Sequence, residues 1–249
     1  MSEQRERYLE ALGISVWRLR TASATTVQPA AEPAPVSAAA SIAAAPLEVV
    51  AARLVTDVSA SPATMGWDEL AATVRVCTQC ALHATRTQTV FGVGRRNADL
   101  LVIGEAPGAD EDRQGEPFVG RAGQLLNSML RAIGLPRSEV YIANILKCRP
   151  PGNRDPQPDE AKTCTPYLAR QIALVNPRAI LAVGRIAAQW LLQTDSPIGR
   201  LRGRVVPYGE AGTPLVITYH PAYLLRSPLA KATAWTDLCL VKDLLGKPQ

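Results

Sequence analysis

The sequence lacks any uninterrupted run of about eighteen apolar residues, the length that a membrane-spanning helix requires. It also lacks the apolar core and cleavage pattern of a signal peptide, since charged residues recur throughout residues 1–20. These absences argue against a membrane or secreted protein. We therefore expect a cytoplasmic protein whose cysteines remain reduced.

Two common nucleotide-binding motifs are absent as well. The chain has neither the G-x-G-x-x-G fingerprint of dinucleotide-binding proteins nor the G-K-[ST] ending of a phosphate-binding loop. Its glycine-rich turn at residues 104–112 instead carries four acidic residues, which would repel a polyanion. The turn therefore favours a chemical role for Glu105 or Glu111, whereas Asp110 and Asp112 are expected to form a solvated acidic turn or helix start.

Histidine and phenylalanine are scarce, at two residues each among 249. Phe118 lies in a polar loop, where an aromatic ring either stacks on a base or anchors the core. His220 directly follows an apolar run and precedes a turn. A lone histidine is usually structural, but this position makes His220 a better ligand candidate.

Cysteine is present in an informative pattern. Cys77 and Cys80 form a C-x2-C pair, and Cys148 and Cys164 follow much later in the chain. In a reduced protein this set favours a metal or iron–sulfur site, and four thiolates suit either zinc or a cluster. Cys239 lies in an apolar helical pattern and is expected to be a buried core residue.

The composition divides the chain into three parts. Residues 21–65 are rich in Ala and Pro and lack aromatic residues, which predicts a disordered linker. Residues 66–249 form the predicted globular domain, and they hold the excess of basic residues behind the net charge of +5. That excess is too modest to demonstrate nucleic-acid binding by itself.

Strands and helices alternate in the globular part. Apolar runs ending in Gly or polar residues predict strands at 99–104, 140–145, 179–184 and 214–219, and helical spacing predicts helices at 67–76, 123–133, 159–175, 185–193 and 231–245. This alternation predicts an α/β fold with a mainly parallel sheet covered on both faces. Ligands of such sheets bind beyond the carboxyl ends of the strands, where Glu105, Asn144 and His220 are found.

Two further segments have open interpretations. Asn144 ends an apolar strand, so its amide either reads the edge of a pyrimidine or makes a structural hydrogen bond. Leu224 and Leu225 either enter a base stack, with Arg226 on a phosphate, or fix a helix to the core. The basic, Pro-rich stretch from Arg149 to Pro156 suggests contact with an anion.

Four motifs and the cysteines, taken as an ordered set, make residues 66–245 resemble a family 4 uracil-DNA glycosylase. The motifs are GEAPG at 104–108, GEPFVGRAG at 115–123, NILKCRPPGNR at 144–154 and HPAYLLR at 220–226. The resemblance implies a three-layer α/β/α sandwich with a four-stranded parallel sheet. It also implies hydrolysis of the N-glycosidic bond of deoxyuridine in DNA, and a [4Fe–4S] cluster on Cys77, Cys80, Cys148 and Cys164.

The resemblance also implies a role for each pocket residue. Glu105 and Ala106 would line the uracil, Phe118 would stack on its ring, and Asn144 would read the edge that differs from cytosine. His220 would lie against a ring carbonyl oxygen.

The residue that activates water is less directly implied. Better-known uracil glycosylases carry an Asp where this chain has Ala106, so the base would be Glu105 or Glu111. Asn153 would position the water or the sugar. The DNA contacts would come from Leu224, Leu225, Arg226, Arg149 and Arg154.

A related class in the superfamily forms a covalent bond to uracil through a histidine in the loop after the second strand. Residues 147–155 contain no histidine. We therefore expect turnover rather than a trapped adduct.

The N-terminal segment 7–20 is similar to the chi-binding peptide of the psi subunit of the bacterial polymerase III clamp loader. The similarity implies a peptide in residues 1–20 that binds chi, with folding back onto the domain as the alternative. The whole chain is then expected to be a monomeric, nucleoid-associated bacterial enzyme acting on uracil-containing DNA. The alternative function is a non-catalytic iron–sulfur nucleic-acid-binding module.

Overall fold

The computed structural model describes residues 61–246. The peptide predicted at residues 1–20 and nearly all of the linker predicted at 21–65 lie outside these residues. Within the described part, no helix is long and apolar enough to cross a membrane.

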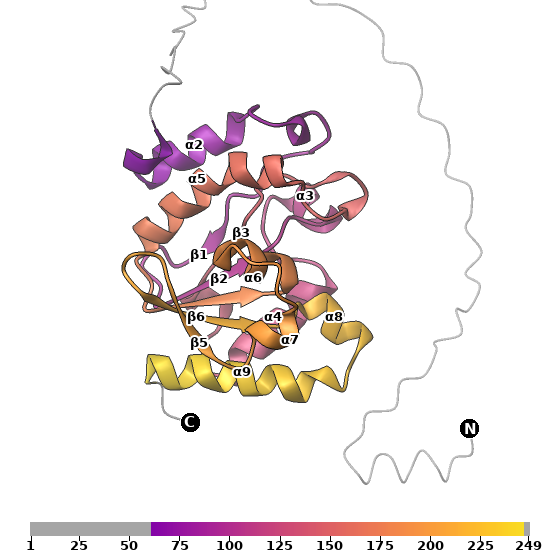
Figure 1. Ribbon diagram of the computed structural model, residues 1–249. Coiled ribbons are helices and arrows are strands. Elements are labelled where there is room, and N and C mark those ends of the chain that lie inside the picture. Colours follow the sequence, from indigo (N-terminus) through magenta and orange to yellow (C-terminus); the bar gives the residue numbers. More distant parts are fainter. Residues whose placement is uncertain (1–60, 247–249) are drawn as a thin grey trace, which may run out of the picture. The chain divides into compact units, whose positions relative to one another are not determined.

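A six-stranded sheet forms the centre of the domain (Figure 1). Its order is β1-β3-β2-β4-β6-β5, and the strands are β1 (Val93–Gly94), β2 (Leu100–Gly104), β3 (Tyr141–Asn144), β4 (Ala179–Val183), β5 (Val205–Tyr208) and β6 (Thr213–Thr218). The four middle strands are parallel, as predicted. The expected count of four strands was too low, because β1 and β5 add an antiparallel strand at each edge.

The apolar runs explain the middle strands. β2, β3 and β4 are buried along their whole length, as expected for parallel strands covered on both faces. The edge strands give weaker signals. β1 has only two residues, and β5 alternates exposed and half-buried positions and contains Pro207, which suits an edge.

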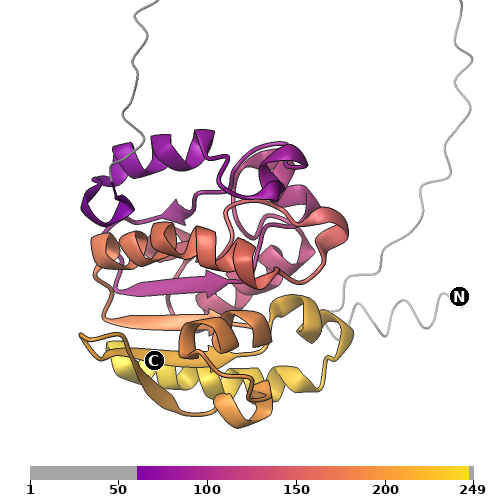
Figure 2. The same ribbon diagram turned by 45° about the horizontal axis from the view of Figure 1, so that its top comes forward.

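Helices cover both faces of the sheet, which makes a three-layer sandwich (Figures 1 and 2). One face packs against α2 (Trp67–Val76), α5 (Pro158–Val175), α6 (Arg185–Leu192) and α7 (Ile198–Leu201). The other packs against α4 (Arg121–Ala132), α8 (Pro221–Arg226) and α9 (Ala230–Leu245). The short helix α3 (Ala109–Gln114) follows β2, and 3-10 turns lie at Pro62–Thr64, Ala81–Ala84, Arg137–Glu139 and Pro151–Asn153.

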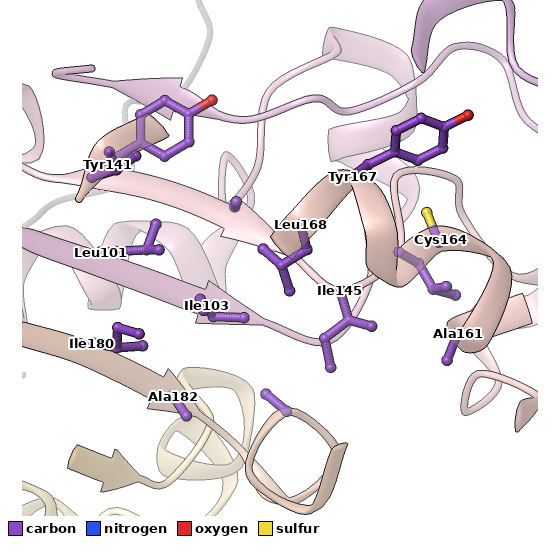
Figure 3. Packing of buried hydrophobic residues seen from close by; sticks show 14 of the residues in the cluster. Leu101, Ile103, Tyr141, Ile145, Ala161, Cys164, Tyr167, Leu168, Ile180 and Ala182 are labelled. Carbon is purple, nitrogen blue, oxygen red and sulfur yellow. The ribbon is translucent and has the colours of Figure 1, made fainter. Parts of the chain in front are cut away.

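Alternate residues of each middle strand enter the two cores. Leu101 and Ile103 point to the core beneath α5, together with Leu168, as Figure 3 shows. Leu100 and Val102 enter the opposite core, beneath α4 and α9. Full burial of one such side chain stabilises a fold by about 1.5–3 kcal/mol, so these two cores fix the strand ends in place.

Candidate active site

The parallel order brings four strand ends to one edge of the sheet. β2 and β3 are in register at Gly104 and Asn144, and β4 and β6 are in register at Val183 and Thr218. The predicted residues Glu105 and His220 directly follow this edge, so the topology gathers the polar groups that the sequence places after separate strands.

Asn144 is buried beside two other pocket residues. A Cβ atom added at Gly104 would meet Asn144 Oδ1 and, at 2.7 Å, Cζ of Phe118. The side chain of Asn144 is almost fully buried, yet Oδ1 has no hydrogen-bond partner among the described residues. An unpaired buried acceptor is costly, so this atom is suited to receive a hydrogen bond from a ligand.

Phe118 lies in an unusual backbone conformation, with φ of 55°. Arg137 fixes this turn, since its Nη1 donates to the carbonyl of Phe118 at 3.3 Å and its Nη2 to that of Pro117 at 2.6 Å. The ring is buried and lies 5.7 Å from the ring of His220, centroid to centroid. The ring is therefore held firmly rather than free to move in solvent.

Glu111 fixes the same loop from the other side. One carboxylate oxygen accepts the backbone N–H groups of Val119 at 2.9 Å and Gly120 at 3.2 Å, and the second accepts that of Gly108 at 3.1 Å. Both oxygens are thus occupied by backbone donors. This geometry gives Glu111 a structural task beside the pocket, whereas the sequence left it as an alternative to Glu105 for activating water.

Glu105 lies in a different environment. Burial and the neighbouring Asp155 raise the pKa of its carboxyl to about 7, although the charge of Arg185 acts in the opposite direction. Arg185 and Asp155 are both exposed and form an ion pair of 2.9 Å. A carboxyl group that titrates near neutral pH can exchange a proton with water under ordinary conditions.

His220 is held as a neutral ring of defined tautomer. It caps α8, and its Nδ1 accepts the backbone N–H of Ala222 at 3.1 Å, so the proton of the neutral ring lies on Nε2. Burial and the charge of Arg226 lower the pKa of His220 to about 4, although the charge of Glu111 acts in the opposite direction. The ring therefore offers an Nε2–H donor throughout the neutral pH range.

The loop after β3 is ordered by its own arginines. Arg149 Nε donates to Asn153 Oδ1 at 2.8 Å. Arg154 donates twice to the buried Glu160, at 2.6 and 2.9 Å. The Arg154 guanidinium thus supports the start of α5, while Asn153 lies exposed at the surface.

The two leucines of α8 lie in different environments. Leu224 is buried in the core, whereas Leu225 is 37% exposed and Arg226 is also exposed. The sequence left two interpretations open, a wedge into a base stack and a helix fixed to the core. The structure suits each interpretation to a different leucine. Leu224 fixes the helix, and Leu225 and Arg226 are free to meet a ligand.

The four predicted cysteine ligands line one cavity. Cys77, Cys80, Cys148 and Cys164 come from the end of α2, the turn after it, the loop after β3 and helix α5. No set of three or more His, Cys, Asp or Glu side chains in residues 61–246 is arranged to hold a single metal ion. Four thiols around a shared space suit either a zinc ion or an iron–sulfur cluster.

Three of these sulfur atoms accept hydrogen bonds. Arg86 Nη1 donates to Cys148 Sγ at 3.0 Å, the backbone N–H of Lys147 to Cys164 Sγ at 3.3 Å, and the hydroxyl of Tyr167 to Cys77 Sγ at 3.3 Å. Burial raises the pKa of Cys164 to about 12, so the thiolate form depends on a bound cation. Figure 3 shows the Cys164 sulfur on the outer side of α5, away from Ile103 and Ala182.

Other expectations need correction. Asp110 and Asp112 lie in the first turn of α3, as expected for a helix start, but Asp112 is not solvated, because both of its buried oxygens accept the backbone N–H of Thr87 at 3.0 Å. Cys239 is half-buried rather than fully buried. The sequence gives no signal for Arg86, Tyr167 and Asp155, because their partners lie too far along the chain for a spacing pattern to reveal them.

Comparison with known proteins yields a family match over the whole pocket region. The model of the "Uracil DNA glycosylase superfamily" matches residues 91–240. The Type-4 uracil-DNA glycosylase of Archaeoglobus fulgidus is 43% identical over 188 residues, which covers 73% of this chain and 94% of that protein. The Type-4 enzymes of Pyrobaculum aerophilum and Thermotoga maritima are 41% and 43% identical, covering 67% and 62% of this chain and 88% and 80% of those proteins.

Proposed function

The chain belongs to the uracil DNA glycosylase superfamily, and on this premise we propose how its residues perform the reaction. It is a DNA repair glycosylase that removes uracil. The proposal concerns the roles of individual residues, the cluster and the partners. The observation that carries it is the unpaired, buried Oδ1 of Asn144 beside Gly104 and Phe118.

Asn144 recognises the base. Uracil has a proton on N3 that can satisfy the lone acceptor Oδ1, and its O4 can accept from the amide nitrogen. Cytosine has an unprotonated N3 and an amino group at these positions, so it would leave the buried acceptor facing another acceptor. The arrangement therefore selects uracil through the cost of an unsatisfied polar group.

Phe118 and Ala106 provide the apolar surfaces of the pocket. The Phe118 ring stacks on the flipped base, and Ala106 and Glu105 line the side after β2. Flipping costs unstacking energy, which stacking on a fixed aromatic ring partly offsets. The hydrogen bonds from Arg137 and to Glu111 hold this ring in advance.

His220 stabilises the departing base. Cleavage of the bond between N1 and the sugar leaves an electron pair on uracil, and negative charge grows on its carbonyl oxygens. The Nε2–H of a neutral His220 donates to one of these oxygens, and this bond strengthens as the charge develops. A prepositioned donor in a buried site loses little energy to reorganisation.

Glu105 activates the water. Its carboxylate accepts a proton as the water oxygen bonds to C1′ of the sugar, and the bond from C1′ to N1 breaks with its electrons going to uracil. Asn153, on the loop after β3, positions the water or the sugar. Glu105 is preferred to Glu111 because the oxygens of Glu111 already accept backbone hydrogen bonds.

DNA is bound around this pocket. Leu225 enters the base stack at the position vacated by the flipped base, and Arg226 and Arg149 contact phosphates. Arg154 supports the loop through Glu160, and Leu224 supports α8 from the core. Each of these residues comes from a loop or short helix next to the carboxyl ends of the strands.

Cys77, Cys80, Cys148 and Cys164 would hold a [4Fe–4S] cluster. Four thiols, three of which accept hydrogen bonds, suit such a group. When bound, the cluster supplies structural cross-linking and a local negative charge rather than chemistry at the sugar. Cys148 directly precedes Arg149 in the loop that also carries Asn153, so a cluster would anchor the start of this loop.

The test of these roles is an oligonucleotide cleavage assay. Purified protein is incubated with U:G, U:A and single-stranded uracil substrates, and abasic sites are converted to breaks by alkali. We expect repeated release of uracil from wild type and a strong loss in Asn144→Ala. A protein that binds DNA without releasing uracil would instead be the non-catalytic binding module, and a stable crosslink would contradict turnover.

A separate hypothesis concerns the N-terminal peptide and its binding partner. Residues 1–20 would bind the chi subunit of the polymerase III holoenzyme and bring a monomeric enzyme to DNA in the cytoplasm, at the nucleoid. Deletion of residues 1–20 should leave activity on short DNA intact and abolish capture of chi. Unchanged capture would reject the hypothesis.

A further inference from the structure

Lys147 is completely buried, which is rare for a lysine. It is 1% exposed. In the sequence it follows Asn144 of the proposed uracil pocket by three residues and directly precedes Cys148 of the cysteine cavity. Burying an ammonium group is energetically costly unless polar partners and a compensating charge surround it. A residue held in such a place is expected to have a task.

The contacts of Lys147 join the two sites. Its Nζ donates to the backbone carbonyl of Asn144 at 2.8 Å and to Gln171 Oε1 at 2.6 Å. Its own backbone N–H donates to Cys164 Sγ at 3.3 Å, and the residue lines the cavity shared by the four cysteines. One residue therefore contacts both the base-reading segment and a cluster ligand.

The second partner of the ammonium is itself fixed. Gln171 Nε2 donates to the carbonyl of Phe91 at 2.9 Å and to the hydroxyl of Tyr141 at 3.3 Å. Within the described chain, neither the ion pairs nor the hydrogen bonds give Lys147 a carboxylate partner. A thiolate-ligated cluster in the adjoining cavity would supply the missing negative charge.

We propose that Lys147 is a positioning residue that holds the main chain of Asn144 against the cluster-bearing loop and so aims the Asn144 amide at uracil. The inference rests on the proposed function, and it deepens that function by adding a residue that does not touch the base. It links the two sites by geometry, because the same residue donates to the main chain of Asn144 and to the sulfur of Cys164. It involves no bond-making step.

The test compares binding of two unreactive duplexes by the full-length, cluster-containing protein. One duplex carries 2′-fluoro-deoxyuridine, which keeps the base, and the other carries a tetrahydrofuran abasic site, which has none. Lys147→Met should weaken binding of the first by about tenfold, the value of one charge-assisted hydrogen bond, and leave the second unchanged. Iron content is measured on the same samples, and wild-type uracil release is measured separately as the test of the proposed function.

Every outcome decides the proposal. Unchanged binding of both duplexes, or equal weakening of both, would overturn it, because a merely structural role does not distinguish a base from its absence. If Lys147→Met does not fold or loses its iron, the test is made with Gln171→Leu, which removes one hydrogen-bond acceptor of Lys147 Nζ. This variant should weaken binding of the 2′-fluoro-deoxyuridine duplex by about threefold and leave binding of the abasic duplex unchanged. Tyr141→Phe is the matched control, because it alters the far side of Gln171 and should behave as wild type.

Discussion

Asn144 and Gly104 lie opposite each other in register at the ends of β3 and β2, and Asn144 Oδ1 occupies the space into which a Cβ atom of residue 104 would project. The backbone angles of Gly104 are ordinary, so its lack of a side chain serves the pocket and not a turn. A Cβ atom at this position would push against both Oδ1 and the Phe118 ring. The register of two parallel strands thus sets the position of the Asn144 amide, which we propose reads the base.

Gly104→Ala should therefore abolish most of the activity. We expect the single-turnover rate of uracil release to fall by about a hundredfold or more, because even small displacements of reacting groups are costly. Gly199→Ala is the control, since a Cβ there meets nothing within 4 Å and should leave the rate unchanged. A rate for Gly104→Ala within threefold of wild type would show that the pocket tolerates the added methyl group.

The pH dependence of the rate should follow Glu105. Because burial and Asp155 raise the pKa of Glu105 to about 7, its carboxylate form increases as the pH rises through 7, and the rate should rise and then level off. The pKa of His220, about 4, leaves this ring neutral across the same range. Asp155→Asn should move the midpoint to lower pH, whereas a wild-type rate independent of pH from 5.5 to 8.5 would contradict the role of Glu105.

Substitution of Glu111 should affect stability first. Glu111→Gln replaces an acceptor oxygen with an amide that faces backbone N–H donors, so we expect a loss of about 2–3 kcal/mol in the free energy of unfolding. Glu105→Gln should lose activity without this destabilisation, because the neutral amide avoids the burial of a charge. Urea unfolding measures the stability of both variants, and single-turnover assays measure their rates of uracil release. If Glu111→Gln lost activity and Glu105→Gln lost stability, the proposed roles of the two carboxylates would have to be exchanged.

The two leucines of α8 should also separate by experiment. Leu225→Ala should lower the rate on duplex DNA by about tenfold more than on single-stranded DNA, because only the duplex requires a wedge. Leu224→Ala should instead destabilise the fold by about 2–5 kcal/mol through the cavity left in the core. Equal effects of Leu225→Ala on both substrates would argue against a wedge.

The cysteines give a prediction about bound iron. Cys148→Ala should lose most of the iron and the visible absorbance of the purified protein and unfold at lower temperature, because a ligand and its hydrogen bond from Arg86 are removed. Cys239→Ala should keep both, since Cys239 lies on α9, outside the cysteine cavity. Full iron content in Cys148→Ala would reject the assignment of this residue as a ligand.

The middle of the fold could be predicted because its signals are local. The buried runs of β2 and β4 and the helical spacing of α4 and α9 are visible within short windows of sequence. The edge strand β5 was not visible, because a half-exposed strand containing Pro207 lacks a buried run. Local sequence patterns therefore predict the middle strands and the helices that cover them, but not the edge strands of the sheet.

The site was predictable in its location but not in its supporting contacts. Asn144 and His220 follow strands, and parallel topology brings strand ends together whatever the loop lengths. By contrast, the contacts of Glu111 with Val119 and of Arg86 with Cys148 depend on how loops fold back, which no periodicity encodes. Two acidic residues of one segment consequently differ in their surroundings. Asp112 accepts a backbone hydrogen bond from Thr87, whereas burial and Asp155 raise the pKa of Glu105.

The placement of the four thiols has a consequence for the folding path. Cys77 and Cys80 precede the first strand, while Cys164 lies beyond the third, so a bound cluster closes a long loop of the chain that contains β1, β2 and β3. Closing such a loop lowers the entropy of the unfolded chain and slows escape from the native state. We therefore expect oxidative loss of iron to increase the rate of proteolysis, with the first cleavage near Cys77 and Cys80. Equal cleavage rates before and after iron removal would contradict this expectation.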